Sequence, residues 1–395
     1  MQKKVILQNI LTNSNIVVIG PMGSGESLWT NNLLNEANKM QHNVHFVTYK
    51  DCLRNVSMLR DGHYIHIDKE SDINMNFFSD LKDIDSLEDI QLEQLAFIVL
   101  SLGKFQEKDI DNKRKEDISI LPCVKDAINS AFESKGCNAG MKEVREALIA
   151  LKNKAHKNGE QNIVNQLVQI IATLKPYSLE SGQYFKHFNG ASNIDSESDF
   201  TVLSIDSYAT QDSILNSVFA MIFLQKSINQ AIKSKKNMNA KRLIGIDEMW
   251  KPSDNQYFLH FLSNAMGIAI KFQFTILIST QTINDFFETS LSEKIYTNSD
   301  LKIFLPHNGD VDKMRFDNQK TKKMVANLKS NQFAVVQSDK QPEIREISLS
   351  KIDILSLSAN HFIRASIENV MQKNNVDLQG AIEMLNQDKQ SCTTW

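Results

Sequence analysis

The sequence lacks any apolar run long enough to cross a membrane. Its most apolar stretches, such as 95–102 and 217–224, are far shorter than the roughly 20 residues that a spanning helix needs. The N-terminus has two lysines but no long apolar segment and no small-residue cleavage site, so no signal peptide is predicted. We therefore expect a cytoplasmic protein that meets membranes only peripherally, through partners.

Paired cysteines and a dominant charge are also missing. The four cysteines are too scattered for a zinc site and are interpreted as reduced thiols: Cys52, Cys123, Cys137 and Cys392. A formal net charge of −3 over 395 residues gives no general attraction to nucleic acid or to anionic lipid. Nucleic acid is therefore not expected as a direct ligand.

What the chain does contain is an alternation of strand-like and helix-like segments. The first β-branched run, 15–19, leads into a helical pattern over 27–40, and another amphipathic helix is predicted at about 214–233. Further strands are predicted at 43–49, 64–68, 200–205, 243–246, 274–278, 301–305 and 333–336. This alternation predicts an α/β fold with a mostly parallel sheet that helices cover on both faces.

A long helical block interrupts the alternation. Between about 81 and 186, leucines and other apolar residues recur at three and four residues, which predicts an all-α insertion, with a solvated charged stretch at 104–117. Two helices are predicted at the end, 359–374 and 378–386. The predicted division is a core of 1–80 and 187–355, an insertion of 81–186 and C-terminal helices in 356–395.

The first chemical motif is the glycine-rich segment 20–27, which lies between the first strand and its helix. Glycines there let backbone N–H groups surround phosphate oxygens, and Ser27 stands where a P-loop hydroxyl ligates Mg²⁺. Taken alone, the segment also fits a turn that binds nothing. The predicted nucleotide-binding residues are Gly20, Gly23, Ser24, Gly25, Glu26, Ser27 and Leu28.

The second motif is an apolar strand, 243–246, that ends on Asp247 and Glu248. In a Walker B motif the first acid holds Mg²⁺ and the second orients or deprotonates the attacking water, so Asp247 and Glu248 are predicted in these roles. Without the glycine loop, two solvated acids after a buried strand would be the simpler interpretation. Gln281, after the next strand, is predicted to contact the γ-phosphate or the water.

With these three elements in order, the chain resembles the ATPases of type IV secretion systems, in particular the TraC-type ATPases of F-like conjugation machines. The matching segments are Ile-Asp-Glu-Met-Trp at 246–250 and Thr-Gln-Thr-Ile-Asn-Asp-Phe at 280–286. The resemblance implies a RecA-like core with an all-α insertion, ATP and Mg²⁺ as ligands, and a hexamer of identical subunits. It also implies other secretion subunits as partners at the inner-membrane channel base, on its cytoplasmic face. Only 19 residues precede Gly20, so we expect the C-terminal half of such a protein.

Two positions depart from the family pattern. Glu26 replaces the phosphate-binding lysine, and segment 265–271 is mostly apolar where the family is rich in arginine. Both changes predict impaired ATP hydrolysis, because cations at these places stabilise phosphate charge. Nucleotide could still bind if Glu26 turned out to solvent, and Glu26 could also be an introduced substitution. Isoleucine at both 268 and 270 favours natural decay instead.

Three functions remain open at this point. The first is a TraC-like ATPase domain that binds nucleotide but hydrolyses it poorly. The second is a non-catalytic, truncated subunit that contacts intact ATPase subunits or the channel base. The third is a DNA-translocating RecA-like motor, which the mixed charge and the lack of a basic stripe disfavour.

Overall fold

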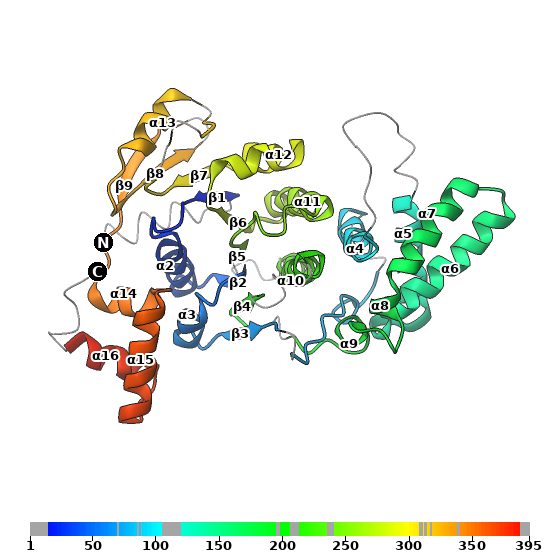
Figure 1. The fold of residues 1–395 in the computed structure, drawn as a ribbon, viewed down its shortest axis with the longest axis horizontal. Helices are drawn as coiled ribbons and strands as arrows, with labels where there is room; N and C mark the ends of the chain where they lie inside the picture. The colour runs from blue at the N-terminus through cyan, green and yellow to red at the C-terminus, as the bar shows by residue number, and fades with distance from the viewer. Residues whose placement is uncertain are drawn as a thin grey trace.

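The computed structural model describes residues 15–68, 71–84, 87, 89–104, 120–194, 198–205, 213–234, 241–307, 311, 314–316, 318–337 and 340–387. The strands are β1 (Ile16–Ile19), β2 (Asn43–Thr48), β3 (His63–His66), β4 (Phe200–Ser204), β5 (Arg242–Ile246), β6 (Thr275–Thr280), β7 (Leu301–Phe304), β8 (Gln332–Gln337) and β9 (Glu343–Glu346). Within the described residues they form one nine-stranded sheet in the order β3-β4-β2-β5-β6-β1-β7-β8-β9 (Figure 1). Neighbouring strands from β3 to β7 are parallel, and β8 and β9 add an antiparallel edge. The predicted α/β fold with a mostly parallel sheet is confirmed.

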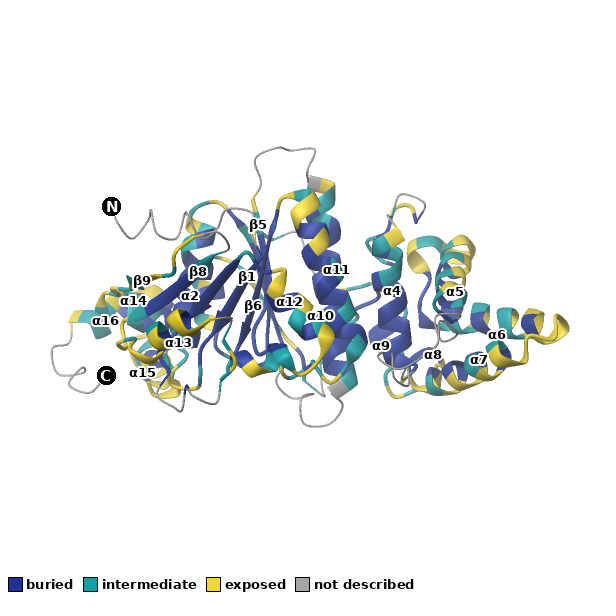
Figure 2. Ribbon diagram, turned by 90° about the horizontal axis from the view of Figure 1, so that it is seen from above, coloured by how far each residue is buried: buried dark blue, intermediate teal, exposed yellow. Residues whose placement is uncertain are grey.

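Helices cover both faces of this sheet. On one face lie α2 (Glu26–Lys39) and α3 (Arg54–Leu59), and on the other lie α10 (Ser213–Ser234) and α11 (Gln256–Phe272) (Figures 1 and 2). Side chains alternate between the two faces along a strand, so the side chains of β1 pack in two separate cores. Ile16 and Val18 pack with α2, whereas Val17 and Ile19 join the core on the α10 and α11 side.

The insertion extends outward from the α10 and α11 face. Helix α4 (Asp89–Leu102) is buried from Gln94 to Leu102, because α10 and α11 cover one side of it and α5 (Ile120–Lys135) covers another. Beyond α5 lie α6 (Met141–Lys157) and α7 (Gln161–Thr173), followed by the short helices α8 (Lys175–Ser178) and α9 (Phe185–Phe188) (Figure 2). Most of the predicted charged stretch falls in 105–119, outside the described residues. None of the helices that the structure describes has the length and apolarity needed to cross a bilayer.

The C-terminal helices form a small cluster of their own beside α3. Helices α14 (Lys351–Leu357), α15 (His361–Asn374) and α16 (Leu378–Gln387) share an apolar core that includes Leu355, Ile363 and Ala381. Arg364 of α15 connects this cluster to the carboxyl end of β2. Its guanidinium donates to the carboxylate of Asp51, which lies just beyond that strand. The remaining helices, α12 (Ser290–Thr297) and α13 (Gln319–Ala326), flank β7 and β8 in the sequence. Strand β9 and the helices α3, α11, α12, α13 and α14 were not predicted from the sequence.

Candidate functional site

The predicted site residues follow neighbouring strands at the same edge of the sheet. Strands β2, β5, β6 and β1 are adjacent and parallel, so their carboxyl ends lie side by side. Backbone hydrogen bonds join the segments that follow them: Gly20 N–H donates to the Thr280 carbonyl over 3.0 Å, and Asp247 N–H donates to the Val47 carbonyl over 2.9 Å. The fold thus brings the glycine loop, the acidic pair and the segment around Gln281 together.

The glycine loop has the backbone conformation that a phosphate-binding turn requires. Gly23 and Gly25 have φ angles of 83° and 86°, in the left-handed region that side chains disfavour. Gly20 must be small, since a β-carbon there would lie 2.7 Å from Cδ1 of Leu305. The loop ends at the first turn of α2, where N–H groups without intrahelical acceptors attract anions. Ser27 and Leu28 lie in this turn, and both are partly buried.

Glu26 points into the site. It is the first residue of α2, its side chain is buried at 6% exposure, and Oε1 has no hydrogen-bond partner. One carboxylate oxygen from each of Glu26, Asp247 and Glu248 lies within 4.8 Å of the others. Burial, followed by the charges of Asp247 and Glu248, raises the pKa of Glu26 from 4.5 to about 9. In this structure Glu26 is therefore buried in the site and does not turn out to solvent.

The carboxylate of Glu248 is bound on several sides. Gln281 Nε2 donates to its two oxygens over 2.9 and 3.0 Å, the indole N–H of Trp250 donates to Oε2, and the ammonium of Lys50 forms an ion pair with Oε1. The backbone of Glu248 is held in the left-handed region, with φ of 55°. Burial alone would raise the pKa of Glu248, but the Lys50 and Gln281 contacts outweigh it and lower the pKa below its usual value.

Lys50 is a charged residue of this site that the sequence analysis missed. It lies two residues beyond the end of β2, and Glu248 follows β5, the neighbour of β2 in the sheet. Burial lowers the pKa of Lys50, but its hydrogen bond and ion pair with Glu248 outweigh this effect and raise the pKa. A lysine directly after the predicted strand 43–49 was a possible signal. The pairing of that strand with β5 was not evident from the sequence.

Asp247 and its surroundings offer oxygen ligands. Its side chain is 3% exposed and accepts a hydrogen bond from the Ser279 hydroxyl. Burial raises the pKa of Asp247 above its usual value. Carboxylate and hydroxyl oxygens are the ligands that Mg²⁺ prefers, and the cluster of Glu26, Asp247 and Glu248 provides them close together. The donor set of this site therefore fits a divalent cation.

The segment without arginines lies away from this site. Asn15 directly precedes β1, and its side-chain amide donates to the Met266 carbonyl over 3.3 Å, so this part of α11 lies at the opposite edge of the sheet from Gly20. Ile268 is 2% exposed and packs in the core, whereas Ile270 is 59% exposed. Side chains at 265–271 thus cannot reach the P-loop of their own chain.

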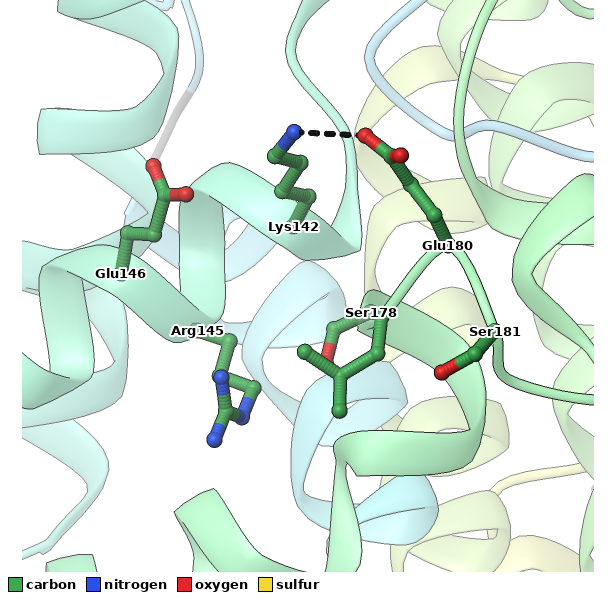
Figure 3. A pocket seen from close by; sticks show the side chains of 7 residues that line it. Lys142, Arg145, Glu146, Ser178, Glu180 and Ser181 are labelled. Carbon is green, nitrogen blue, oxygen red and sulfur yellow. Dashed lines mark hydrogen bonds and ion pairs between the residues drawn. The ribbon is translucent and has the colours of Figure 1, made fainter.

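A separate cavity of about 400 Å³ lies in the insertion, between α6 and the segment after α8 (Figure 3). Its two cations already have partners. Lys142 pairs with Glu180 over 3.0 Å, and Arg145 Nε donates to the Ile171 carbonyl over 3.1 Å. None of the predicted nucleotide or metal residues lines this cavity, so we do not assign the chemistry of the P-loop edge to it.

The raised pKa of Glu26 makes stability depend on pH. Between the unfolded value of 4.5 and the folded value of about 9, only the native state holds this proton. We expect the free energy of unfolding to fall by roughly 1 kcal/mol per pH unit as pH rises through this window. Urea unfolding in EDTA measures this slope, and Glu26→Gln should flatten it. Equal slopes for the two proteins would contradict the burial of a titrating Glu26 among Asp247, Glu248 and Lys50.

Solved structures of other proteins superpose on this fold. VirB4 of Thermoanaerobacter pseudethanolicus superposes with a TM-score of 0.65 at 15% identity, covering 86% of this chain and 91% of that one. The plasmid coupling protein TrwB in complex with ADP and Mg²⁺ superposes with a TM-score of 0.59 at 11% identity, covering 86% of each chain. These similarities confirm the RecA-like P-loop fold. Among curated protein sequences, none matches this chain.

The family is shown by the sequence itself. The profile of the TraG P-loop domain matches residues 1–372, nearly the whole chain. The glycine loop and the acidic pair occupy one edge of the sheet, as a P-loop NTPase requires. The chain therefore belongs to the TraG P-loop domain family, among the ATPases of conjugation and type IV secretion.

Proposed function

We propose that this chain is a TraC-like subunit of a conjugative transfer system that binds Mg²⁺ and nucleotide weakly and hydrolyses ATP poorly. The observation that carries the proposal is the buried carboxylate of Glu26 within 4.8 Å of those of Asp247 and Glu248. Nucleotide phosphates would meet a carboxyl group where the P-loop motif supplies a lysine, so the attraction of an ammonium is missing. The loop glycines and the first turn of α2 still offer N–H donors to phosphate.

Poor hydrolysis is expected because the carboxylate of Glu248 is already bound by other side chains and has a lowered pKa. A general base must be free to accept a proton from water, and its efficiency falls as its pKa falls. Here Lys50, Gln281 and Trp250 occupy both carboxylate oxygens, and the pKa of Glu248 is below its usual value. When bound, Mg²⁺ would neutralise phosphate charge, and Ser27 and Asp247 are the residues proposed to hold it.

Assembly and location are part of the same proposal. By its resemblance to TraC-type ATPases, the chain would form a hexamer at the cytoplasmic face of the inner membrane and contact other secretion subunits there. The apolar segment 265–271 supports a subunit that lends no arginine to a neighbouring site. Such a subunit could still complete a ring with intact ATPase subunits, which is how a non-catalytic role would operate.

Titration with a fluorescent ATP analogue tests the nucleotide site. We expect weak, saturable binding that Mg²⁺ strengthens and that unlabelled ATP displaces. Ser27→Ala should lose most of the Mg²⁺ effect, because it removes the proposed hydroxyl ligand. A matched control on an exposed face of the same helix, Glu36→Gln, should bind as the parent does. Binding that is unsaturable, or unaffected by unlabelled ATP, would remove the proposal.

A further inference from the structure

Three buried carboxylates meet at the P-loop edge from two parts of the chain. Glu26 comes from the start of α2, and Asp247 and Glu248 come from the end of β5. Their side chains are 6%, 3% and 1% exposed. The cation that pairs with this cluster is Lys50, through Glu248, so three acids face one ammonium. Buried carboxyl groups in such excess must be neutralised, either by protons or by a further cation.

One oxygen of this cluster, on Glu26, is left without a partner. Glu26 Oε1 is buried and has no hydrogen-bond partner, whereas Asp247 accepts from Ser279 and Glu248 accepts from Gln281. Two oxygens on one cation lie at most twice the metal–oxygen distance apart, which is about 4.2 Å for Mg²⁺ and about 5 Å for Ca²⁺. The three carboxylate oxygens lie within 4.8 Å of one another, which is inside the limit for Ca²⁺ and close to the limit for Mg²⁺.

We propose that Glu26, Asp247 and Glu248 bind a hard divalent cation directly, with no nucleotide present. Glu26 is the residue that makes this site different from a P-loop with lysine, because an ammonium at this position would repel the cation. The bound cation then brings positive charge to the place where the P-loop motif has its lysine. Because it forms without nucleotide, the site can exist or fail independently of the proposed function.

A titration of the nucleotide-free chain with Mn²⁺ tests this site. Binding is measured as the loss of the EPR signal of free Mn²⁺. We expect one Mn²⁺ per chain, displaced by Mg²⁺ or Ca²⁺, and an increase in melting temperature on binding. Glu26→Gln keeps the shape of the side chain and should weaken binding tenfold or more. Glu36→Gln, on the same helix but paired with Lys39 at the surface, should leave the affinity unchanged.

Two results would overturn the assignment. One is a parent protein that binds no Mn²⁺ at millimolar concentrations, and the other is a Glu26→Gln protein that binds as tightly as the parent. If Glu26→Gln does not fold, Lys50→Met decides the question, because it removes the competing ammonium and leaves the three ligands in place. We expect this variant to bind Mn²⁺ several-fold more tightly, and an unchanged or weaker affinity would contradict the site.

Discussion

Glu26→Lys should strengthen the binding of Mg²⁺ and ATP by about a hundredfold or more. Two unit charges about 4 Å apart interact by about 4 kcal/mol at an effective dielectric near 20, and each 1.4 kcal/mol is about a factor of ten. The substitution removes the carboxyl group and places an attracting ammonium beside the phosphates. It also balances the site, because Asp247 and Glu248 would then face two ammonium groups instead of one.

Glu26→Gln is the matched control for this experiment. It removes the carboxylate without adding a cation, so we expect a gain of about tenfold, clearly less than for lysine. Fluorescent-analogue titration on both proteins, with circular dichroism to verify folding, separates the two effects. If the lysine variant folds and binds no better than the glutamine variant, the loop does not hold phosphate and the nucleotide site loses its main support.

Lys50→Met should destabilise the protein by about 2 to 3 kcal/mol. Removing one partner of a buried ion pair costs about 3 to 5 kcal/mol, because the other charge stays buried, and exposure of Lys50 to water reduces this figure. Glu248 is 1% exposed and the Lys50 side chain is 36% exposed. Urea unfolding in EDTA measures the difference. Methionine keeps the length of the stem, so the lost ammonium dominates the effect.

A second pair on the surface serves as the comparison. Lys39 and Glu36 lie 2.7 Å apart with both side chains partly exposed, so Lys39→Met should change stability by only about 0.5 kcal/mol or less. The double variant Lys50→Met with Glu248→Gln should recover most of the loss, since it also removes the carboxylate that pairs with Lys50. If Lys50→Met cost no more than Lys39→Met, Glu248 would not be held by an ion pair.

The glycine loop and the acidic pair could be predicted because their signals are local. A β-branched run before Gly20, a helical pattern after Ser27 and an apolar strand before Asp247 each specify strand, loop or helix within a few residues. Gln281 was predicted to join these motifs because it follows the next predicted strand. The structure adds that Gln281 donates to Glu248.

Lys50 and the direction of Glu26 could not be predicted, because both depend on distant parts of the chain. Strand β2 lies between β4 and β5, which follow it by more than 150 residues, and only this pairing places Lys50 beside Glu248. Strand β9 was not predicted because it is short and mostly charged. Only four residues, Glu343–Glu346, form this edge strand. Long-range strand order is thus the information that the local pattern lacks.

The rate of phosphate release from ATP tests the account most directly. The purified protein, with Mg²⁺ and ATP above the measured binding constant, should release no phosphate beyond that of a buffer blank. The reason is the combination of buried Glu26 with a Glu248 carboxylate already bound by Lys50, Gln281 and Trp250. Turnover at about 1 per second or faster, within the ordinary range of enzymes, would contradict it.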